Sequence, residues 1–383
     1  MNRFTAEISS AVTDGVSTKD LHALRIVNKA WSVAATPRLF RRIEIQDSLS
    51  SVNALKNVLM VEELAGHVRE IVYRSQYVDQ DGQPLRKCPN VDFGASIPLA
   101  GIQYGMLKPH PVIPENGISM SPEEHKLIDA LKETFGLIAK ARHLSTLKLL
   151  FSPHSTDNPD GFEFCSSFEI LEAVVGVSKA ISLRSLTLVN IAVADESVYE
   201  RPEFMALLRG LSQLQITVVS NEKLDPKINR DYPDDPWSIF WEDIMFQRIL
   251  PSLNGSSALT HLVLHSGEHI GIKPTFSFKA LHFPCLSSLS LMRITFDEKI
   301  GTEDFIIRHK ATLSRLELYR CLLLVHFDED KPARLWSQIW DRFAKELTGL
   351  KEFMLSTEWD QNARRDKYGD YEAVQLDRII LKL

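Results

Sequence analysis

One arrangement of apolar positions recurs seven times along the chain. Each copy reads Leu-x-x-(Leu/Phe)-x-(Leu/Ile), and its last two apolar positions lie two apart, so they point to the same side of an extended strand. The copies begin at Leu144, Leu183, Leu211, Leu259, Leu286, Leu313 and Leu350. One such strand cannot bury its apolar side alone, whereas stacked copies can. The pattern therefore predicts a solenoid.

The intervals between copies indicate an irregular array with insertions. The copies at 259, 286 and 313 follow one another every 27 residues, which is within the range of leucine-rich repeats, and the other intervals are 39, 28, 48 and 37 residues. Val68, Ile71 and Tyr73 form a half-copy before the first full one. We expect an α/β fold of about eight right-handed units, in which a curved parallel sheet is covered by outer helices.

Two stretches between the copies are rich in turn-forming residues, and both are predicted to be loop insertions. The first, near 82–120, is dense in glycine and proline, and the second, near 221–237, is acidic and also contains several prolines. Insertions in a solenoid tend to lie on one face and often bind partners. The second stretch is therefore either a solvated loop or part of a recognition element.

A helix start follows the first insertion. Ser121 stands at the cap position, Pro122 at the first helical position and Glu124 at the third, as in a capping box. The apolar residues expected on one face of this helix are Leu127, Ile128, Leu131 and Phe135. The helix is predicted to run to about Arg142 and to lead into the first full copy.

The strand phase also identifies the residues that alternate with the inward leucines, and we expect them to be exposed on the concave face of the sheet. Some of them are aromatic, Arg or Met side chains, which are enriched at protein interfaces. The candidate partner-binding patch consists of His261, His265, Met292, Arg315 and Tyr319. The alternative is an ordinary surface, because singly exposed apolar residues are common.

Composition narrows the classes of function. The net charge is 44 − 50 = −6, which disfavours a nucleic-acid partner because there is no basic excess to neutralise phosphates. No stretch approaches the roughly 20 apolar residues of a membrane span, and the first residues lack the apolar region of a signal peptide. We expect no membrane partner, and a cytoplasmic or nuclear location.

The cysteines indicate neither disulfides nor zinc. They stand far apart, at 88, 165, 285 and 321, which is unlike a disulfide framework or a metal-ligand spacing. Cys321 follows Leu313 by eight residues, where leucine-rich repeats often carry Asn or Cys after the strand. We expect a buried, structural role for it.

Catalytic interpretations are weak. His261, His265 and His269 are four apart, but the first two fall in a predicted strand, where four residues span roughly 13 Å, too far for one zinc ion. The segment from Gly94 to Pro98 is one residue short of a nucleophile elbow and lies in a predicted loop. We expect no catalytic residue, no metal and no cofactor.

The first 46 residues have a different character. Ser17 opens a helical apolar pattern with a capping-box-like start, and Pro37 is predicted to begin a short second helical stretch. An alternating run from Ile43 to Ile45 follows.

This segment resembles an F-box. The family's runs Leu/Val-Ser-x-Lys-Asp-Leu, Leu-Arg-x-Val-x-Lys-x-Trp and x-Pro-x-Leu-Phe/Trp have counterparts at 16–21, 24–31 and 36–40. Thr5 stands where the family usually has proline, and Gly15 where it has a bulky residue. Glycine inside a helix costs about 0.5–1 kcal/mol relative to alanine, so the first helix is expected to be weakened.

The rest of the chain resembles fungal F-box proteins with leucine-rich repeats, most strongly at 64–74 and 280–324. The resemblance implies a substrate-recognition subunit of a Skp–cullin–F-box ubiquitin ligase. In such a protein the F-box-like module, here 1–46, binds the Skp-type adaptor and through it a cullin. The irregular repeat domain, here 47–383, presents a target protein. The receptor does no chemistry itself, but raises the concentration of a target lysine near the ubiquitin-loaded enzyme.

On this resemblance, five residues form the adaptor contact or support it: Leu21, Leu24, Val27, Trp31 and Leu39. The alternative is that they are only the core of a small helical domain. A competing function is a ligase-independent interaction scaffold with a degenerate F-box, which Thr5 and Gly15 favour. The identity of the target protein is not encoded in these features.

Overall fold

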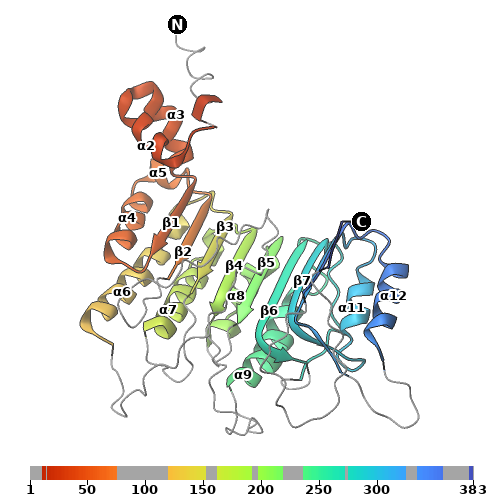
Figure 1. Ribbon diagram of the computed structural model, residues 1–383. Helices are drawn as coiled ribbons and strands as arrows, with labels where there is room; N and C mark the ends of the chain where they lie inside the picture. Colours follow the sequence, from red (N-terminus) through yellow and green to blue (C-terminus); the bar gives the residue numbers. More distant parts are fainter. Residues whose placement is uncertain are drawn as a thin grey trace, which may run out of the picture.

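The computed structural model describes residues 11–13, 15–75, 120–151, 162–191, 197–218, 236–271, 275–324, 334–356 and 379–382. It is an α/β fold built on an 11-stranded sheet with the order β1-β2-β3-β4-β5-β6-β7-β8-β10-β11, and β9 pairs with β7 (Figure 1). The strands are β1 (Arg42–Gln46), β2 (Glu70–Arg74), β3 (Thr146–Leu150), β4 (Ser185–Ile191), β5 (Gln213–Val218), β6 (His261–Ile270), β7 (Ser288–Phe296), β8 (Arg315–Tyr319), β9 (Leu322–Leu323), β10 (Glu352–Ser356) and β11 (Ile379–Lys382).

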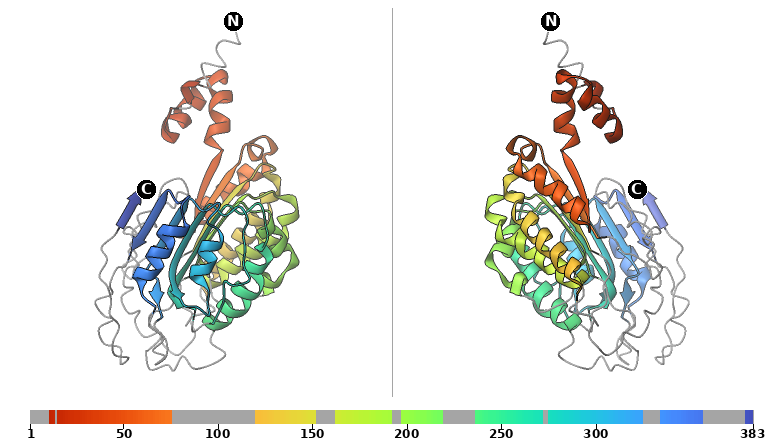
Figure 2. Two further views of the ribbon diagram at one scale, coloured as in Figure 1. Left: turned by 90° about the vertical axis from the view of Figure 1, so that its right-hand side faces the viewer. Right: turned by 90° about the vertical axis from the view of Figure 1, so that its left-hand side faces the viewer.

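Helices cover one face of the curved sheet (Figure 2). They are α4 (Leu49–Met60), α5 (Glu62–Ala65), α6 (Pro122–Gly136), α7 (Phe162–Gly176), α8 (Pro202–Arg209), α9 (Pro236–Ile239), a π-helix (Phe240–Ile249), α10 (Leu250–Leu253), α11 (Thr302–Arg308) and α12 (Trp336–Glu346). Short 3₁₀ turns lie at Ile138–Lys140, Ser178–Ala180 and Ser197–Glu200. The predicted insertion near 82–120 lies outside the described residues apart from its last one, and that near 221–237 apart from its last two.

The predicted strand phase is confirmed by the register of the sheet. Neighbouring strands from β1 to β8, and β8 with β10, are parallel, and the fourth position of every sequence copy is directly opposite the same position of the next copy. That row contains Leu147, Leu186, Leu214, Leu262, Leu289, Leu316 and Phe353. Its leucines are all buried, so one apolar layer runs through the array.

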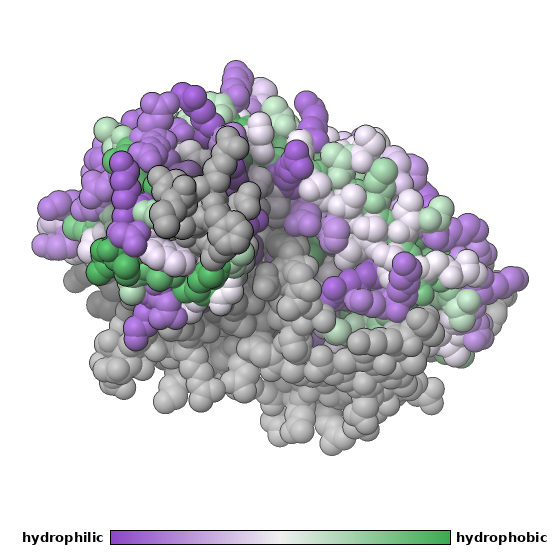
Figure 3. Space-filling model, turned by 90° about the horizontal axis from the view of Figure 1, so that it is seen from above, coloured by the Kyte–Doolittle hydropathy of each residue, from purple (hydrophilic) through white to green (hydrophobic). Residues whose placement is uncertain are grey.

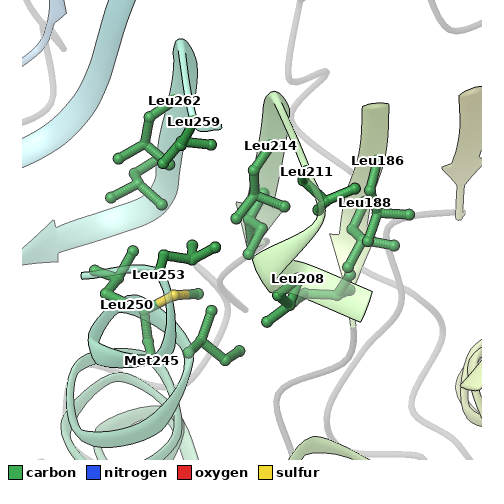
Figure 4. Close-up of a cluster of buried hydrophobic side chains, with 14 of the residues drawn as sticks. Leu186, Leu188, Leu208, Leu211, Leu214, Met245, Leu250, Leu253, Leu259 and Leu262 are labelled. Atoms are coloured by element: carbon green, nitrogen blue, oxygen red, sulfur yellow. The ribbon is translucent and has the colours of Figure 1, made fainter. Parts of the chain in front are cut away.

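This layer belongs to a single continuous core between sheet and helices, extending from Ile45 to Leu355. Figure 4 shows its central part, where Leu186, Leu188 and Leu214 of the strands face helical residues, among them Leu208 and Leu250. Burying one such leucine contributes roughly 1.5–3 kcal/mol. The stacked repeats therefore stabilise one another, and no single unit has a core of its own.

A hydroxyl ladder also joins successive repeats. The residue after the first leucine of a copy is often Ser or Thr, and its hydroxyl donates to the backbone carbonyl of the equivalent residue one repeat earlier. The pairs are Ser145 to Arg69 (3.3 Å), Ser212 to Arg184 (3.0 Å), Thr260 to Ser212 (3.0 Å), Ser287 to Thr260 (3.1 Å) and Ser314 to Ser287 (3.1 Å). We call this the ladder position of the repeat.

The backbone conformation near the end of the strand also recurs in three of the units. Asn190, Arg293 and Arg320 each stand two residues after the last leucine of their copy, and all three have positive φ, at 58°, 57° and 47°. Asn190 donates from Nδ2 to the carbonyl of Phe151 in the preceding unit (2.8 Å). The Asn190 side chain therefore links its unit to the unit before it.

The predicted helix start at Ser121 is confirmed. The hydroxyl of Ser121 accepts from the backbone of Glu124, the Glu124 carboxylate accepts from the backbone of Ser121, and Pro122 is the first residue of α6. Ile128, Leu131 and Phe135 are buried on one face. The predicted end near Arg142 is wrong, because α6 stops at Gly136 and a 3₁₀ turn continues the chain to Lys140.

Two helices precede the sheet and project from its first strand (Figure 1). At the start of α2 (Thr18–Val27), the hydroxyl of Ser17 accepts a hydrogen bond from the backbone N–H of Asp20. At the start of α3 (Lys29–Leu39), the side chain of Asn28 accepts one from the backbone N–H of Trp31. The prediction that Pro37 begins a helix is wrong, because it lies inside α3. The Phe40 N–H to Thr36 carbonyl bond (3.1 Å) carries the last turn past the proline.

The two ends of the sheet contain strands that the repeat pattern does not mark. β1 lies inside the segment expected to form the N-terminal module, yet it pairs with β2 and places Ile45 in the core of the repeats. β11 pairs antiparallel with β10 and covers the last edge of the array. The helical module proper therefore ends near Phe40.

Candidate protein-interaction surfaces

The helices α2 and α3 form a small module with an apolar cluster separate from the main core. Its buried members are Leu21, Ala35 and Leu39, and Val16, Leu24 and Phe40 pack against them. The guanidinium of Arg25 lies 5.0 Å from the centre of the Phe40 ring and adds a cation–π contact between the helices. The cluster holds the two helices together but is too small to cover their apolar residues.

Large apolar side chains consequently remain at the surface of this module. Ile26 is 85% exposed, Val27 62% and Val33 67%. Figure 3 shows hydrophobic residues at the surface on the left of the molecule, the side on which the two helices lie. Most of the other large apolar residues that the structure describes are buried, so these exposed side chains mark a candidate contact surface.

The five predicted adaptor residues divide into two groups. Leu21 and Leu39 are buried in the small cluster, and Leu24 is half-buried against it, so these three support the module. Val27 is exposed and Trp31 half-buried, so these two can contact a partner. Sequence reasoning missed Ile26 and Val33, which are apolar residues of α2 and α3 that point away from the cluster.

Gly15 was expected to lie inside a helix, but it does not. It lies in a turn after the helical residues 11–13, where its N–H donates to the carbonyl of Val12 (3.3 Å). Thr5, the other departure from the family pattern, lies outside the described residues.

The open face of the sheet, opposite the helices, presents three rows of side chains because the register repeats from strand to strand. The row at the start of the strands includes Gln213, His261, Ser288 and Arg315, and the row at their end includes Thr217, His265, Met292 and Tyr319. The five residues of the predicted patch therefore lie on neighbouring strands of the same face. The His265 and Tyr319 rings meet edge to face with their centres 6.0 Å apart.

The expected exposure is wrong for three of these five. His265 is only 6% exposed, Met292 3% and Tyr319 3%, and the last two form a buried cluster with Met354. Large side chains stand opposite one another on strands about 4.8 Å apart, so they cover each other. The row at the start of the strands is more open, since His261 and Arg315 are both half-buried.

The charge of Arg315 is balanced within the face. Its Nη2 lies 2.5 Å from Oε1 of Glu317, and its Nε lies 3.6 Å from Oε2 of Glu352. Burial lowers the pKa of His261 below its ordinary value, and the positive charge of Arg315 adds to this effect. At neutral pH this part of the face is therefore an uncharged histidine beside an arginine shared by two carboxylates.

The histidines of β6 bond to separate partners. His265 Nε2 is 2.9 Å from the Ser290 hydroxyl, and burial lowers the pKa of His265 to about 3. His269 Nε2 is 2.9 Å from the carbonyl of Arg320. Within the described ranges, no group of three His, Cys, Asp or Glu residues could hold a metal ion.

Cys321 lies beside the turn that follows β8. Its Sγ is 3.6 Å from the carbonyl of Tyr319 and 3.8 Å from that of Leu291, and burial raises the pKa of the thiol to about 12. A thiol with such a pKa is a poor nucleophile at neutral pH. Cys321 as a residue is half-buried rather than fully buried as expected, and the environment of its thiol fits a structural role.

Among the helices that the structure describes, none has the length and apolar character needed to cross a membrane. No protein-family model matches the chain, and no curated protein matches it in sequence.

Proposed function

We propose that the chain is a substrate-recognition subunit of a Skp–cullin–F-box ubiquitin ligase. Its N-terminal helical module would bind the Skp-type adaptor, and its leucine-rich repeats would bind a target protein. In this proposal the chain does no chemistry itself and works in the cytoplasm or the nucleus. The observation that carries it is the exposed apolar surface of Ile26, Val27 and Val33 on a module with a very small core.

The size of the module supports a partner. Helical units below about 40 residues rarely bury enough apolar surface to be stable alone. Here the buried cluster has three members, while three aliphatic side chains of the same two helices face solvent. Covering each of these side chains with a partner would contribute roughly 1.5–3 kcal/mol. That is enough for the apolar centre of a specific interface.

The position of the module suits a bridging role. The two helices project from the β1 end of the sheet, and the repeats extend away from them (Figure 1). An adaptor on α2 and α3 would leave the open face and the loops of the later repeats accessible. For the target, the accessible part of the predicted patch is His261 and Arg315, whereas His265, Met292 and Tyr319 are buried in the row at the other end of the strands.

Co-purification from cells tests this proposal. The intact chain is expected to bring down a Skp-type adaptor and a cullin, and the double substitution Ile26→Asp, Val33→Asp is expected to lose both while keeping bound targets. The matched control is Val61→Asp, because Val61 is an exposed aliphatic residue outside the module. Targets without adaptor or cullin from the intact chain would instead support the ligase-independent scaffold.

A further inference from the structure

Three arginines replace the hydroxyl at the ladder position in the first part of the array. Where most other units carry Ser or Thr, the units of β1, β2 and β4 carry Arg41, Arg69 and Arg184. Backbone bonds fix their order across the sheet: Arg69 N–H to Arg41 O (2.9 Å), Ser145 N–H to Arg69 O (3.0 Å) and Arg184 N–H to Ser145 O (2.8 Å). With a strand spacing of about 4.8 Å, the three arginines span about 14 Å along one edge.

No carboxylate in the part of the chain that the structure describes pairs with these arginines. Arg41 and Arg184 are exposed, Arg69 is half-buried, and no ion pair joins any of them to an acidic side chain in the described ranges. Nη1 of Arg69, at the middle of the three, is buried and has no hydrogen-bond partner among the described residues. A buried donor without an acceptor is unfavourable, and a carboxylate that reaches the Arg69 guanidinium would supply one.

Neighbouring basic residues behave differently. Arg42 and Lys148 both pair with Glu70 (3.9 and 3.1 Å), and Arg142 pairs with Glu62 (3.2 Å). Among the described residues, the adjacent cations are therefore neutralised, whereas Arg41, Arg69 and Arg184 have no acidic partner. We call these three residues the arginine edge.

We propose that the arginine edge binds an acidic, Asp/Glu-rich segment of a protein partner. Arginine binds carboxylates through paired, charge-assisted hydrogen bonds. Carboxylates on alternate residues of an extended peptide lie about 6.8 Å apart, a spacing that flexible arginine side chains anchored about 4.8 and 9.6 Å apart can match. The segment runs across the strands, along the edge from which the N-terminal module projects (Figure 1).

A nucleic acid fits this edge less well. The chain's 50 acidic side chains outnumber its 44 basic ones and give it a net charge of −6. These charges repel a polyanion that extends beyond the arginines but tolerate a short acidic segment. The inference goes beyond the proposed function and does not depend on it, because adaptor binding uses other residues.

The chain itself supplies the substitutions that test this. Ser is the natural residue at the ladder position of other repeats, so Arg69→Ser with Arg184→Ser removes two charges and allows the hydroxyl ladder to form. Lys351→Ser is the matched control, since Lys351 occupies the same position in the unit of β10, where its N–H bonds to Ser314 O (2.8 Å). If the serine variant is unstable, Arg69→Gln with Arg184→Gln keeps the long side chains without their charge.

The measurement is fluorescence anisotropy of the full chain with a labelled peptide of alternating Glu and Ser. Two lost charge-assisted hydrogen bonds at about 1.5 kcal/mol each predict that binding is weakened roughly a hundredfold in the double variant. Binding is expected to persist in Lys351→Ser, and a Gln/Ser peptide is expected not to bind. Equal affinity of the double variant, an equal loss in the control, or tighter binding of a phosphorylated peptide or an RNA of equal length would overturn the proposal. Adaptor co-purification should be unchanged in every variant.

Discussion

At the scale of single residues, buried histidines couple the stability of the repeats to pH. His309 is buried after α11, where its Nδ1 lies 2.7 Å from the carbonyl of Phe305 and its Nε2 accepts from the N–H of Phe283 (2.9 Å). The second bond requires an unprotonated Nε2, so the neutral tautomer with the proton on Nδ1 is the one that fits. Burial lowers the pKa of His309 to about 4, with a smaller contribution from the neighbouring His282 and Arg308.

This arrangement predicts a loss of stability in mild acid. An unfolded histidine binds a proton near pH 6.5, whereas folded His309 resists protonation until about pH 4, so the unfolded state holds more protons in between. The free energy of unfolding should therefore fall as pH drops from 6.5 towards 4, by roughly 1–2 kcal/mol at pH 5 from this residue. Urea unfolding at pH 7 and pH 5 measures it, and His309→Gln should show the smaller difference. An equal difference in the two proteins would exclude His309 as the source.

At the scale of the repeating element, the seven leucine-rich copies predicted both the strand phase and the neighbours in the sheet. They could do so because a period of two fixes which side chains are buried. They could not predict how far the side chains on the open face are buried, because the burial of His265 and Tyr319 depends on side chains of other strands. Nor could they reveal β11, whose pairing with β10 is antiparallel and follows no repeat.

The leucine spacing does not predict the hydroxyl bonds at the ladder position, although the residues that make them follow a regular pattern in the sequence. Ser145, Ser212, Thr260, Ser287 and Ser314 each follow the first leucine of a copy. The spacing concerns only the apolar positions, so it makes no prediction for the small polar residue between them. The arginine edge is apparent only against this background, since Arg69 and Arg184 look ordinary when each is considered alone.

Three substitutions in β7 test both the predicted strand phase and the burial of the side chains on the open face. Leu289→Asp places a charge in the core and should prevent soluble expression, because burying an unpaired carboxylate costs several kcal/mol. Ser290→Asp should be destabilising, since Ser290 is buried and bonded to His265. Ser288→Asp, half-buried at the start of the strand, should be tolerated. Thermal unfolding ranks the three, and a stable Leu289→Asp would show that the phase is reversed.

At the scale of the whole molecule, the described residues form one apolar cluster in the N-terminal module and a separate main core in the repeats, with a boundary near Phe40. The cluster of Leu21, Ala35 and Leu39 belongs to the N-terminal module, and the core that begins at Ile45 belongs to the repeats. The boundary predicted from the sequence is at 46, because the short alternating run from Ile43 to Ile45 does not by itself indicate that it pairs with β2.

Two truncations distinguish the boundaries. Removal of residues 1–40 should leave the repeats folded with little change in stability, because β1 and Ile45 remain. Removal of 1–46 also deletes β1, so it should cost about 2–4 kcal/mol and expose the edge of β2. Chemical unfolding of the two truncated chains measures the difference. Equal stability would show that β1 contributes nothing to the array.

The central claim is that the exposed apolar surface of α2 and α3 binds a Skp-type adaptor. Calorimetric titration of the purified full chain with a purified adaptor tests it most directly. One-to-one binding by the intact chain should be weakened at least a hundredfold by Ile26→Asp with Val33→Asp, since roughly 3 kcal/mol of apolar burial is lost, and it should be unchanged by Val61→Asp. Undiminished binding by the double variant, or no binding by the intact chain, would contradict the account.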